Sequence, residues 1–250
     1  CDASVLFEKR YKEEIAQATA DIYAAAGEEF NINSPMQLGN ILFEKLHLPA
    51  PRKGKRGAYS TSADILEKLA GDYKIVRDVL RCRHYQKLLS TYIDGFKPLI
   101  DSKTGLVHTS FNQVQTTTGR LSSANPNLQN IPIRANDGRE LRKLFIARAP
   151  DRVLIDADYS QIELRLLAHF SGCKELIEAY KEGQDIHALT ASQVFSVPIG
   201  DVSDAQRRAA KAVNFGIIYG ISDFGLASNL NISAKQSGEY IKKYFETYSD

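Results

Sequence analysis

The strongest constraint on the fold is a helical period of apolar residues at the start of the sequence. From Asp2 to Ala26, apolar side chains recur four and three residues apart, which places them on one face of an amphipathic helix. Gly27 can end this helix, because glycine readily adopts the left-handed backbone found after helix C-termini. A similar stripe from Asp72 to about Asp94 predicts a second long helix. The two helices are expected to pair in antiparallel fashion.

The pattern between and after these helices predicts a mixed fold. Asn33-Ser34-Pro35 supplies a cap followed by proline, which favours the start of a shorter helix. Residues 105–111 and 153–155 have the composition of short strands, and a domain change is expected near residue 105. Helices are predicted again at 161–170, 173–182, 186–195, 204–220 and 233–248. The fold class expected is therefore helix-rich α+β.

Composition excludes several classes of protein. No apolar run reaches the roughly 20 residues that span a bilayer, and no secretory signal pattern opens the sequence, so no membrane partner is expected. The three cysteines are widely spaced and form no C-x-x-C pair, which argues against a disulfide framework and a structural zinc. A net charge of +2 is too small to indicate a nucleic-acid partner by itself.

A turn-rich segment carries a local concentration of positive charge. Its four cations are Arg52, Lys53, Lys55 and Arg56. Such a loop can contact nucleic-acid phosphates, or it can be a solvated loop with no ligand. The segment alone leaves both interpretations open.

Two acids follow the apolar run at 153–155. Asp156 and Asp158 lie two residues apart and would share one face of an extended strand. Ser160 and Glu163 match the S-x-x-E capping box, so this region could simply begin the next helix. Alternatively, an acid exposed at a strand end could ligate Mg2+, which prefers carboxylate oxygens and substrate phosphates.

A later helix combines cations and aromatic rings on one stripe. Arg207, Lys211, Phe215 and Tyr219 recur every four residues, and each step advances about 40° around a helix. One possibility is that the rings are buried and the cations merely solvated. The other is a nucleotide site, because cations stabilise phosphate charge and aromatic rings stack on bases.

Four ordered segments resemble a known family. Asp158-Tyr159-Ser160-Gln161-Ile162-Glu163-Leu164-Arg165 resembles motif A of the family A DNA polymerases, the family of bacterial DNA polymerase I, and residues 207–220 resemble motif B. Residues 118–123 with 127–132 resemble the segment that contacts primer and template, and Asp185-Ile186-His187 matches a further family segment. The opening helices resemble the family's thumb. The likeness extends over essentially the whole chain.

The resemblance implies roles for individual residues. It makes Asp158 a catalytic metal ligand together with the carbonyl of Tyr159, and it places Gln161 and Glu163 at the substrate, with Glu163 beneath the sugar. The residues implied to hold the triphosphate are Arg207, Lys211, His187 and Arg134, of which Arg207 and Lys211 count as catalytic. Phe215 would lie near the sugar, and Tyr219 would occupy the place of the templating base in an open state. Primer and template would meet Arg120, Asn127, Gln129 and Asn130.

The resemblance also implies an architecture and an activity. It predicts a helical thumb-like region at 1–105, an incomplete antiparallel-sheet palm at 106–165 and partial helical fingers at 166–250. The implied activity is template-directed DNA synthesis by a two-metal mechanism with two Mg2+ ions. The implied partners are primer-template DNA and deoxynucleoside triphosphates, without a membrane or an obligate protein partner. The implied location is the cytoplasm of a bacterium, in association with the nucleoid.

The chain departs from the family pattern at one place. The family's His-Asp-Glu segment is missing, because none of the five histidines is followed by Asp-Glu. The chain is therefore expected to be a truncated polymerase-domain fragment that is inactive alone, and the alternative is a non-catalytic DNA-binding fragment. A phosphotransferase with a Walker loop is disfavoured, because the sequence contains no G-x-x-x-x-G-K-[ST] motif.

Overall fold

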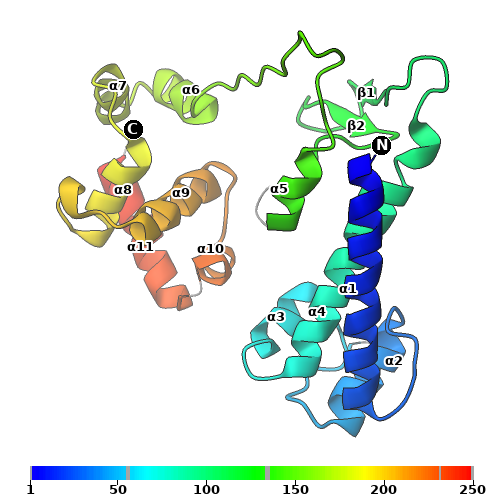
Figure 1. The fold of residues 1–250 in the computed structure, drawn as a ribbon. Helices are drawn as coiled ribbons and strands as arrows, with labels where there is room; N and C mark the ends of the chain where they lie inside the picture. Colours follow the sequence, from blue (N-terminus) through cyan, green and yellow to red (C-terminus); the bar gives the residue numbers. More distant parts are fainter. Residues whose placement is uncertain (1, 55–56, 133–135, 231, 249–250) are drawn as a thin grey trace. The chain divides into compact units, whose positions relative to one another are not determined.

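The protein divides into two compact units, Cys1–Leu154 and Ile155–Asp250, each considered by itself below (Figure 1). The computed structural model describes residues 2–54, 57–132, 136–230 and 232–248. The helices of the first unit are α1 (Asp2–Ala26), α2 (Pro35–Gly39), α3 (Ala63–Leu69), α4 (Lys74–Leu88) and α5 (Asn136–Arg142), with π-helical segments at Asn40–Lys45 and Leu89–Asp94 and a 3-10 turn at Lys97–Leu99. Its strands are β1 (Ser110–Asn112) and β2 (Ser122–Ala124).

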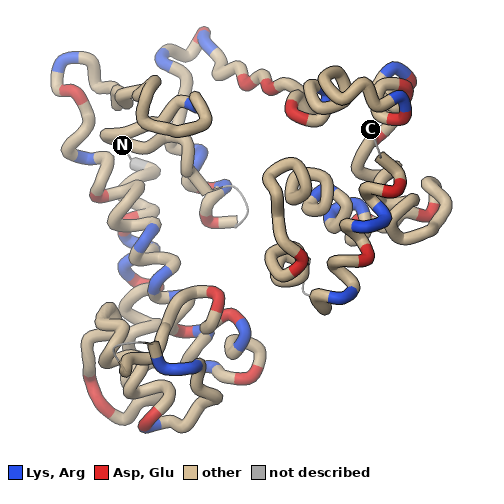
Figure 2. The backbone as a smooth tube through the Cα atoms, turned by 180° about the vertical axis from the view of Figure 1, so that it is seen from behind, with Lys and Arg blue, Asp and Glu red and all other residues tan. Residues whose placement is uncertain are grey.

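The long pair formed by α1 and α4 organises the first unit. Helix α1 has the bounds predicted from its apolar stripe, and Gly27 follows it with φ +73°. Helix α4 and the π-helical segment after it together cover most of the second predicted helix. Helices α2 and α3 lie at one end of the pair (Figure 1), where Ala18, Ile22 and Val79 are buried in a common core. Acidic and basic positions are interspersed along the pair (Figure 2).

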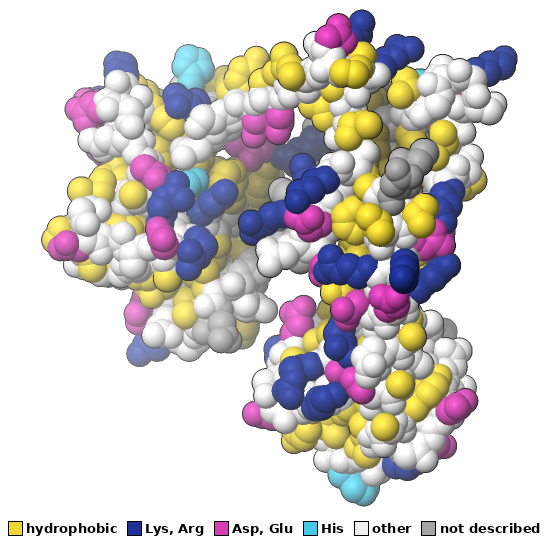
Figure 3. Space-filling model, in the orientation of Figure 1, with side chains coloured by type: hydrophobic (Ala, Val, Ile, Leu, Met, Phe, Trp, Pro, Cys, Tyr) yellow, Lys and Arg dark blue, Asp and Glu magenta, His cyan; other side chains and the backbone are white. Residues whose placement is uncertain are grey.

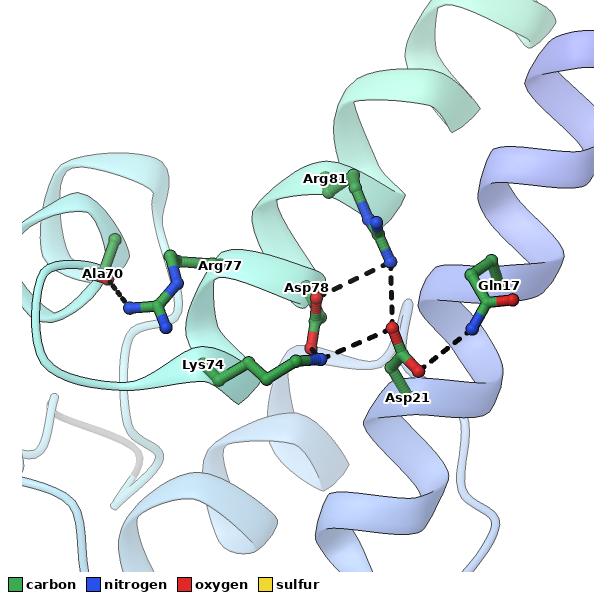
Figure 4. A network of polar contacts seen from close by, with 7 residues as sticks. All are labelled: Gln17, Asp21, Ala70, Lys74, Arg77, Asp78 and Arg81. Atoms are coloured by element: carbon green, nitrogen blue, oxygen red, sulfur yellow. Dashed lines mark hydrogen bonds and ion pairs between the residues drawn. The ribbon is translucent and has the colours of Figure 1, made fainter.

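A polar network joins α1 to α4 beside this core (Figure 4). Asp21 of α1 lies 3.4 Å from Lys74 Nζ and 3.1 Å from Arg81 Nη2, and it accepts a hydrogen bond from Gln17. Asp78 of α4 accepts from Lys74 at 2.8 Å and lies 3.6 Å from Arg81. Asp78 is only 6% exposed, so its negative charge requires these cations in the folded state.

Helix α5 and the small sheet occupy the opposite end of the pair. Leu141 of α5 packs with Tyr11 and Tyr85 in a second core. Asp137 of α5 pairs with Arg10 of α1 and accepts a hydrogen bond from the Tyr85 hydroxyl at 3.1 Å. Strands β1 and β2 are antiparallel and form the two-stranded sheet that completes the predicted helix-rich α+β class.

The strand predictions were only partly correct. Of residues 105–111, the strand β1 includes Ser110 and Phe111, whereas Val107 forms an isolated bridge with Ile100. The prediction of a strand at 153–155 was wrong: these three side chains are 79%, 67% and 87% exposed and the backbone forms no strand. An extended apolar run becomes a strand only when a neighbouring backbone hydrogen-bonds to it, and no described segment does so here.

The second unit is a bundle of helices. Its elements are α6 (Ile162–Ser171), α7 (Lys174–Lys181), α8 (Ile186–Phe195), a 3-10 turn (Ile199–Asp201), α9 (Asp204–Ile218), α10 (Asp223–Leu230) and α11 (Ala234–Thr247). Leu164, Ile186, Val213, Leu226 and Tyr244 are buried in one core that draws on α6, α8, α9, α10 and α11. Helices α9 and α11 both begin with a capping box. None of the described helices is long and apolar enough to cross a membrane.

The α1–α4 network should contribute measurably to stability. We predict that Asp78→Asn lowers the free energy of unfolding by about 1 to 3 kcal/mol, because Lys74 and Arg81 lose their nearly buried charged partner. Glu13→Gln is the matched control, since Glu13 is largely exposed and 4.0 Å from Lys9. Urea denaturation of both variants measures the effect, and equal losses would contradict a stabilising role for the network.

Candidate nucleotide site

An open cavity of 370 Å³ in the second unit brings together most of the residues predicted to bind the nucleotide or a metal ion. Its walls contain Asp158, Tyr159, Gln161, Ile162, Glu163, His187, Arg207, Lys211 and Phe215. These residues come from the segment before α6, from the first turns of α6 and α8, and from the outer stripe of α9. Residues up to 57 positions apart in the sequence thus share one hollow. Their roles toward a ligand remain predictions.

The side chain of Arg207, which lines the cavity, is fixed by a contact between α8 and α9. Asp185 caps α8 and accepts hydrogen bonds from the backbone N–H groups of His187, at 2.9 Å, and Ala188, at 3.3 Å. The same carboxylate accepts from Arg207 Nε at 2.6 Å. Burial alone would raise the pKa of Asp185, but Arg207 and the two backbone donors hold it below its ordinary value.

Positive charge is concentrated on α9. Arg207 and Lys211 line the cavity, and Arg208 lies beside them on the exposed side of the helix. In the space-filling view, Lys and Arg side chains gather on this face of the unit (Figure 3), and the backbone tube marks Lys and Arg positions along α9 (Figure 2). Because Arg207 uses Nε for Asp185, its two terminal nitrogens are the groups that can reach an anion.

His187 is held from inside the protein by residues that the sequence analysis missed. Asn214 Nδ2 lies 2.9 Å from His187 Nδ1, and Thr190 Oγ1 donates to Asn214 Oδ1 at 3.1 Å. All three residues are buried. Burial lowers the pKa of His187, and the charges of Arg207 and Lys211 add to this effect against the opposing charge of Asp185. The sequence could have indicated Asn214, because this polar residue lies next to Val213 on the buried face of α9, where a carboxamide needs a hydrogen-bond partner.

The aromatic end of the stripe lies farther along α9. The ring of Phe215 is 5.7 Å from the ring of His187, centroid to centroid. Tyr219 follows the end of α9 and its hydroxyl donates to Glu163 Oε1 at 2.8 Å. Glu163 lies in the first turn of α6, so this bond joins the start of α6 to the end of α9. Tyr219 does not line the cavity itself.

The start of α6 differs from the expected capping box. The helix begins at Ile162, and the residue before it, Gln161, has a left-handed backbone with φ +52°. The interpretation that Ser160 caps the helix was wrong, because no side chain caps it and Ser160 instead accepts a bond from Arg165 Nε through its carbonyl. The Gln161 side chain is held by Tyr180, whose hydroxyl donates to Oε1 at 3.0 Å.

The acidic groups provide limited capacity for a metal. Asp158 is exposed and lines the cavity beside Tyr159, whereas the carboxylate of Glu163 is engaged by Tyr219. Within the described residues, no group of three or more His, Cys, Asp or Glu side chains could hold an ion. Mg2+ commonly takes one or two carboxylates together with substrate phosphates and water, so Asp158 fits one ion shared with a nucleotide. One carboxylate does not account for two ions.

Three of the four residues predicted to meet primer and template lie after β2. Gln129 accepts from Ser123 N and donates to Leu121 O, both at 3.1 Å, and Asn127 accepts from Gln129 N at 2.9 Å. The carbonyl of Asn130 accepts from the Tyr92 hydroxyl. The side chains of Asn127 and Gln129 thus hydrogen-bond to the backbone of their own loop. Arg120 is exposed in the turn before β2.

The basic loop is described only in part. Arg52 is exposed, whereas Lys53 donates to Glu44 at 2.9 Å and lies over the ring of Tyr59. The hydrogen bond that Lys53 donates to Glu44 raises the pKa of Lys53, and the paired carboxylate offsets part of its positive charge. Two more of its predicted contacts, Lys55 and Arg56, lie outside the described residues, as does the predicted phosphate contact Arg134.

Comparison with known proteins identifies the family. A family model described as DNA polymerase family A matches residues 2–250. DNA polymerase I of Geobacillus stearothermophilus is 55% identical over 236 residues, which are 94% of this chain and 27% of that protein. DNA polymerase I of Caldicellulosiruptor bescii is 52% identical over 247 residues, which are 99% of this chain and 29% of that protein.

A solved structure agrees with the sequence matches. It is described as the POL domain of Pol1 from M. smegmatis in complex with DNA primer-template and dNTP. It superposes with a TM-score of 0.87 at 38% identity, over 99% of this chain and 44% of that one. The chain spans less than a third of the length of the two DNA polymerase I relatives. Because the family model matches almost every residue, the chain belongs to DNA polymerase family A.

Proposed function

We propose that this chain forms part of a template-directed DNA polymerase, with the cavity of the second unit as its nucleotide site. The observation that carries the proposal is the gathering of Arg207, Lys211 and His187 beside Phe215 in one hollow that also contains Asp158. Membership of DNA polymerase family A supports it. So does the solved relative, whose description names primer-template DNA and dNTP.

The arrangement suits a deoxynucleoside triphosphate. Arg207 and Lys211 supply positive charge for the phosphates, because charge-assisted hydrogen bonds to phosphate are stronger than neutral ones. Phe215 offers an apolar surface for the sugar, and Glu163 lines the same cavity. Tyr219 is hydrogen-bonded to Glu163, so a movement at the end of α9 would displace the Glu163 carboxylate at the proposed sugar position.

The proposed reaction is nucleotidyl transfer. The primer 3′ oxygen forms a bond to the α-phosphorus, the bond from that phosphorus to the bridging oxygen breaks, and pyrophosphate leaves with the bonding electrons while the hydroxyl proton is released. Arg207 and Lys211 stabilise the charge that develops on the leaving group. Asp158 and the Tyr159 carbonyl would hold Mg2+ together with the substrate phosphates, and the bound ion would supply Lewis-acid stabilisation of the reacting oxygens.

The 250-residue chain by itself is proposed to bind DNA without extending it. The cavity offers Asp158 as its available carboxylate, and the sequence has no His-Asp-Glu segment. The exposed cations Arg52 and Arg120 favour a DNA-binding role for the first unit. Within this proposal, residues 1–105 act as thumb, 106–165 as partial palm and 166–250 as partial fingers of a bacterial cytoplasmic enzyme.

The nucleotide site can be tested with neighbouring cations on one helix. In a polymerase of the relatives' length that contains this sequence, we predict that Lys211→Ala lowers kcat/KM for dNTP by about 10- to 100-fold, because a charge-assisted phosphate contact is lost. Arg208→Ala is the control, since Arg208 is exposed and does not line the cavity. Steady-state primer extension measures both variants. Equal losses in the two, or a parallel loss of DNA affinity in Lys211→Ala, would place the triphosphate elsewhere.

The competence of the isolated chain is a separate test. We predict that the purified 250-residue chain binds labelled primer-template DNA, with affinity that falls as salt rises, and extends no primer with Mg2+ and dNTPs. Each phosphate neutralised on duplex DNA adds about 0.9 to the negative slope of log affinity against log salt. Fluorescence anisotropy at several salt concentrations gives the slope. Sustained extension would show the chain to be competent, and a zero slope would remove the DNA-binding role.

A further inference from the structure

The second unit contains a buried chain of polar side chains that ends at the nucleotide cavity. His187, Thr190 and Asn214 are 2%, 0% and 1% exposed, so the hydroxyl of Thr190 and the carboxamide of Asn214 are removed from water. The carboxamide of Asn214 must therefore satisfy both its donor and its acceptor within the protein. It contacts Thr190 through Oδ1, at 3.1 Å, and His187 through Nδ2, at 2.9 Å.

The hydrogen bonds along this chain run in one direction. Thr190 Oγ1 gives its proton to Asn214 Oδ1, so in its 3.3 Å contact with Tyr248 the tyrosine hydroxyl must be the donor. With its oxygen occupied, Asn214 presents an N–H to His187 Nδ1. An N–H donor requires an acceptor, so Nδ1 carries no proton. The proton of the neutral imidazole then lies on Nε2, which no described residue hydrogen-bonds.

We propose that Asn214 is a positioning residue that holds His187 as the neutral Nε2–H tautomer and thereby makes it a hydrogen-bond donor to a phosphate oxygen. The phosphate part rests on the proposed function of the cavity; the tautomer rests on the buried chain alone. Phosphate oxygens only accept hydrogen bonds, so a neutral histidine with its proton on Nδ1 would present a lone pair to them. The Asn214 contact excludes that arrangement.

The charges around His187 agree with a neutral ring. Asp185, at the start of the same helix, favours the protonated form, while Arg207 and Lys211 of α9 disfavour it. Together with burial, they leave the pKa of His187 below its ordinary value. The aromatic ring of Phe215 adds no charge at 5.7 Å. Arg207 and Lys211 supply positive charge for the phosphates, and the neutral ring of His187 supplies a hydrogen-bond donor with a fixed direction.

Nitrogen NMR of the 250-residue chain tests the tautomer without any ligand. With 15N-labelled histidine and His187→Gln to identify the signal, we expect His187 to be protonated on Nε2 alone at neutral pH. Asn214→Asp keeps the shape but makes the group an acceptor only, so it should move a proton to Nδ1 and raise the pKa of His187 by about one unit or more. Thr190→Val should loosen the tautomer preference, whereas Thr190→Ser should preserve it.

Two results would overturn the proposal. One is a wild-type His187 that carries its proton on Nδ1, or on both nitrogens, at neutral pH. The other is an unchanged tautomer and pKa in Asn214→Asp while thermal unfolding shows that the variant is folded. If Asn214→Asp does not fold, the wild-type spectrum and the comparison of Thr190→Val with Thr190→Ser still test the tautomer of His187.

Titration with inorganic tripolyphosphate separates the tautomer from the function. We expect the Nε2–H signal of His187 to shift with saturation in the wild type, and the apparent affinity to fall several-fold in Thr190→Val but not in Thr190→Ser. An Nε2–H tautomer with no response to tripolyphosphate would refute the phosphate contact and count against the proposed nucleotide site. The inference about Asn214 and the tautomer would stand in that case.

Discussion

The contact between helices α8 and α9 is the constraint on which the site depends. Two side-chain contacts link the start of α8 to α9: Asp185 accepts a hydrogen bond from Arg207, and Asn214 contacts His187. Asp185 also caps α8, so one side chain both starts that helix and anchors the first cation of the stripe. If either link were lost, the side chain that it holds, Arg207 or His187, would lose its fixed orientation.

These links explain how a small cavity can carry so much positive charge. Arg207 and Lys211 on one stripe repel each other, but Asp185 compensates Arg207 and both cations reach solvent. His187 is buried beside them, and burial together with the two cations lowers its pKa, which disfavours a third positive charge in a poorly solvated position. Negative charge on an incoming polyphosphate would therefore balance the positive charge of Arg207 and Lys211 that Asp185 does not compensate.

The sequence predicted what local periodicity determines. The bounds of α1 and α8 follow from residues three and four apart and were confirmed. Of the four residues of the predicted stripe, Arg207, Lys211 and Phe215 line one cavity, whereas Tyr219 lies beyond the end of α9. The run at 153–155 failed because a strand needs a partner backbone, which no local pattern supplies. Ser160 failed as a cap because Gln161 adopts a left-handed backbone. Asn214 and Thr190 went unnoticed because a polar residue on a buried helix face acquires meaning only through its partner on another helix.

We propose that the cavity receives the triphosphate at the cationic half of α9. Isothermal titration of the 250-residue chain with deoxyadenosine, dAMP and dATP tests it most directly, in parallel with an Arg207→Ala/Lys211→Ala double variant. We predict that affinity rises with each added phosphate in the wild type and that this rise is largely lost in the double variant. Affinity that does not depend on phosphate number, or a dependence that survives removal of both cations, would contradict the account.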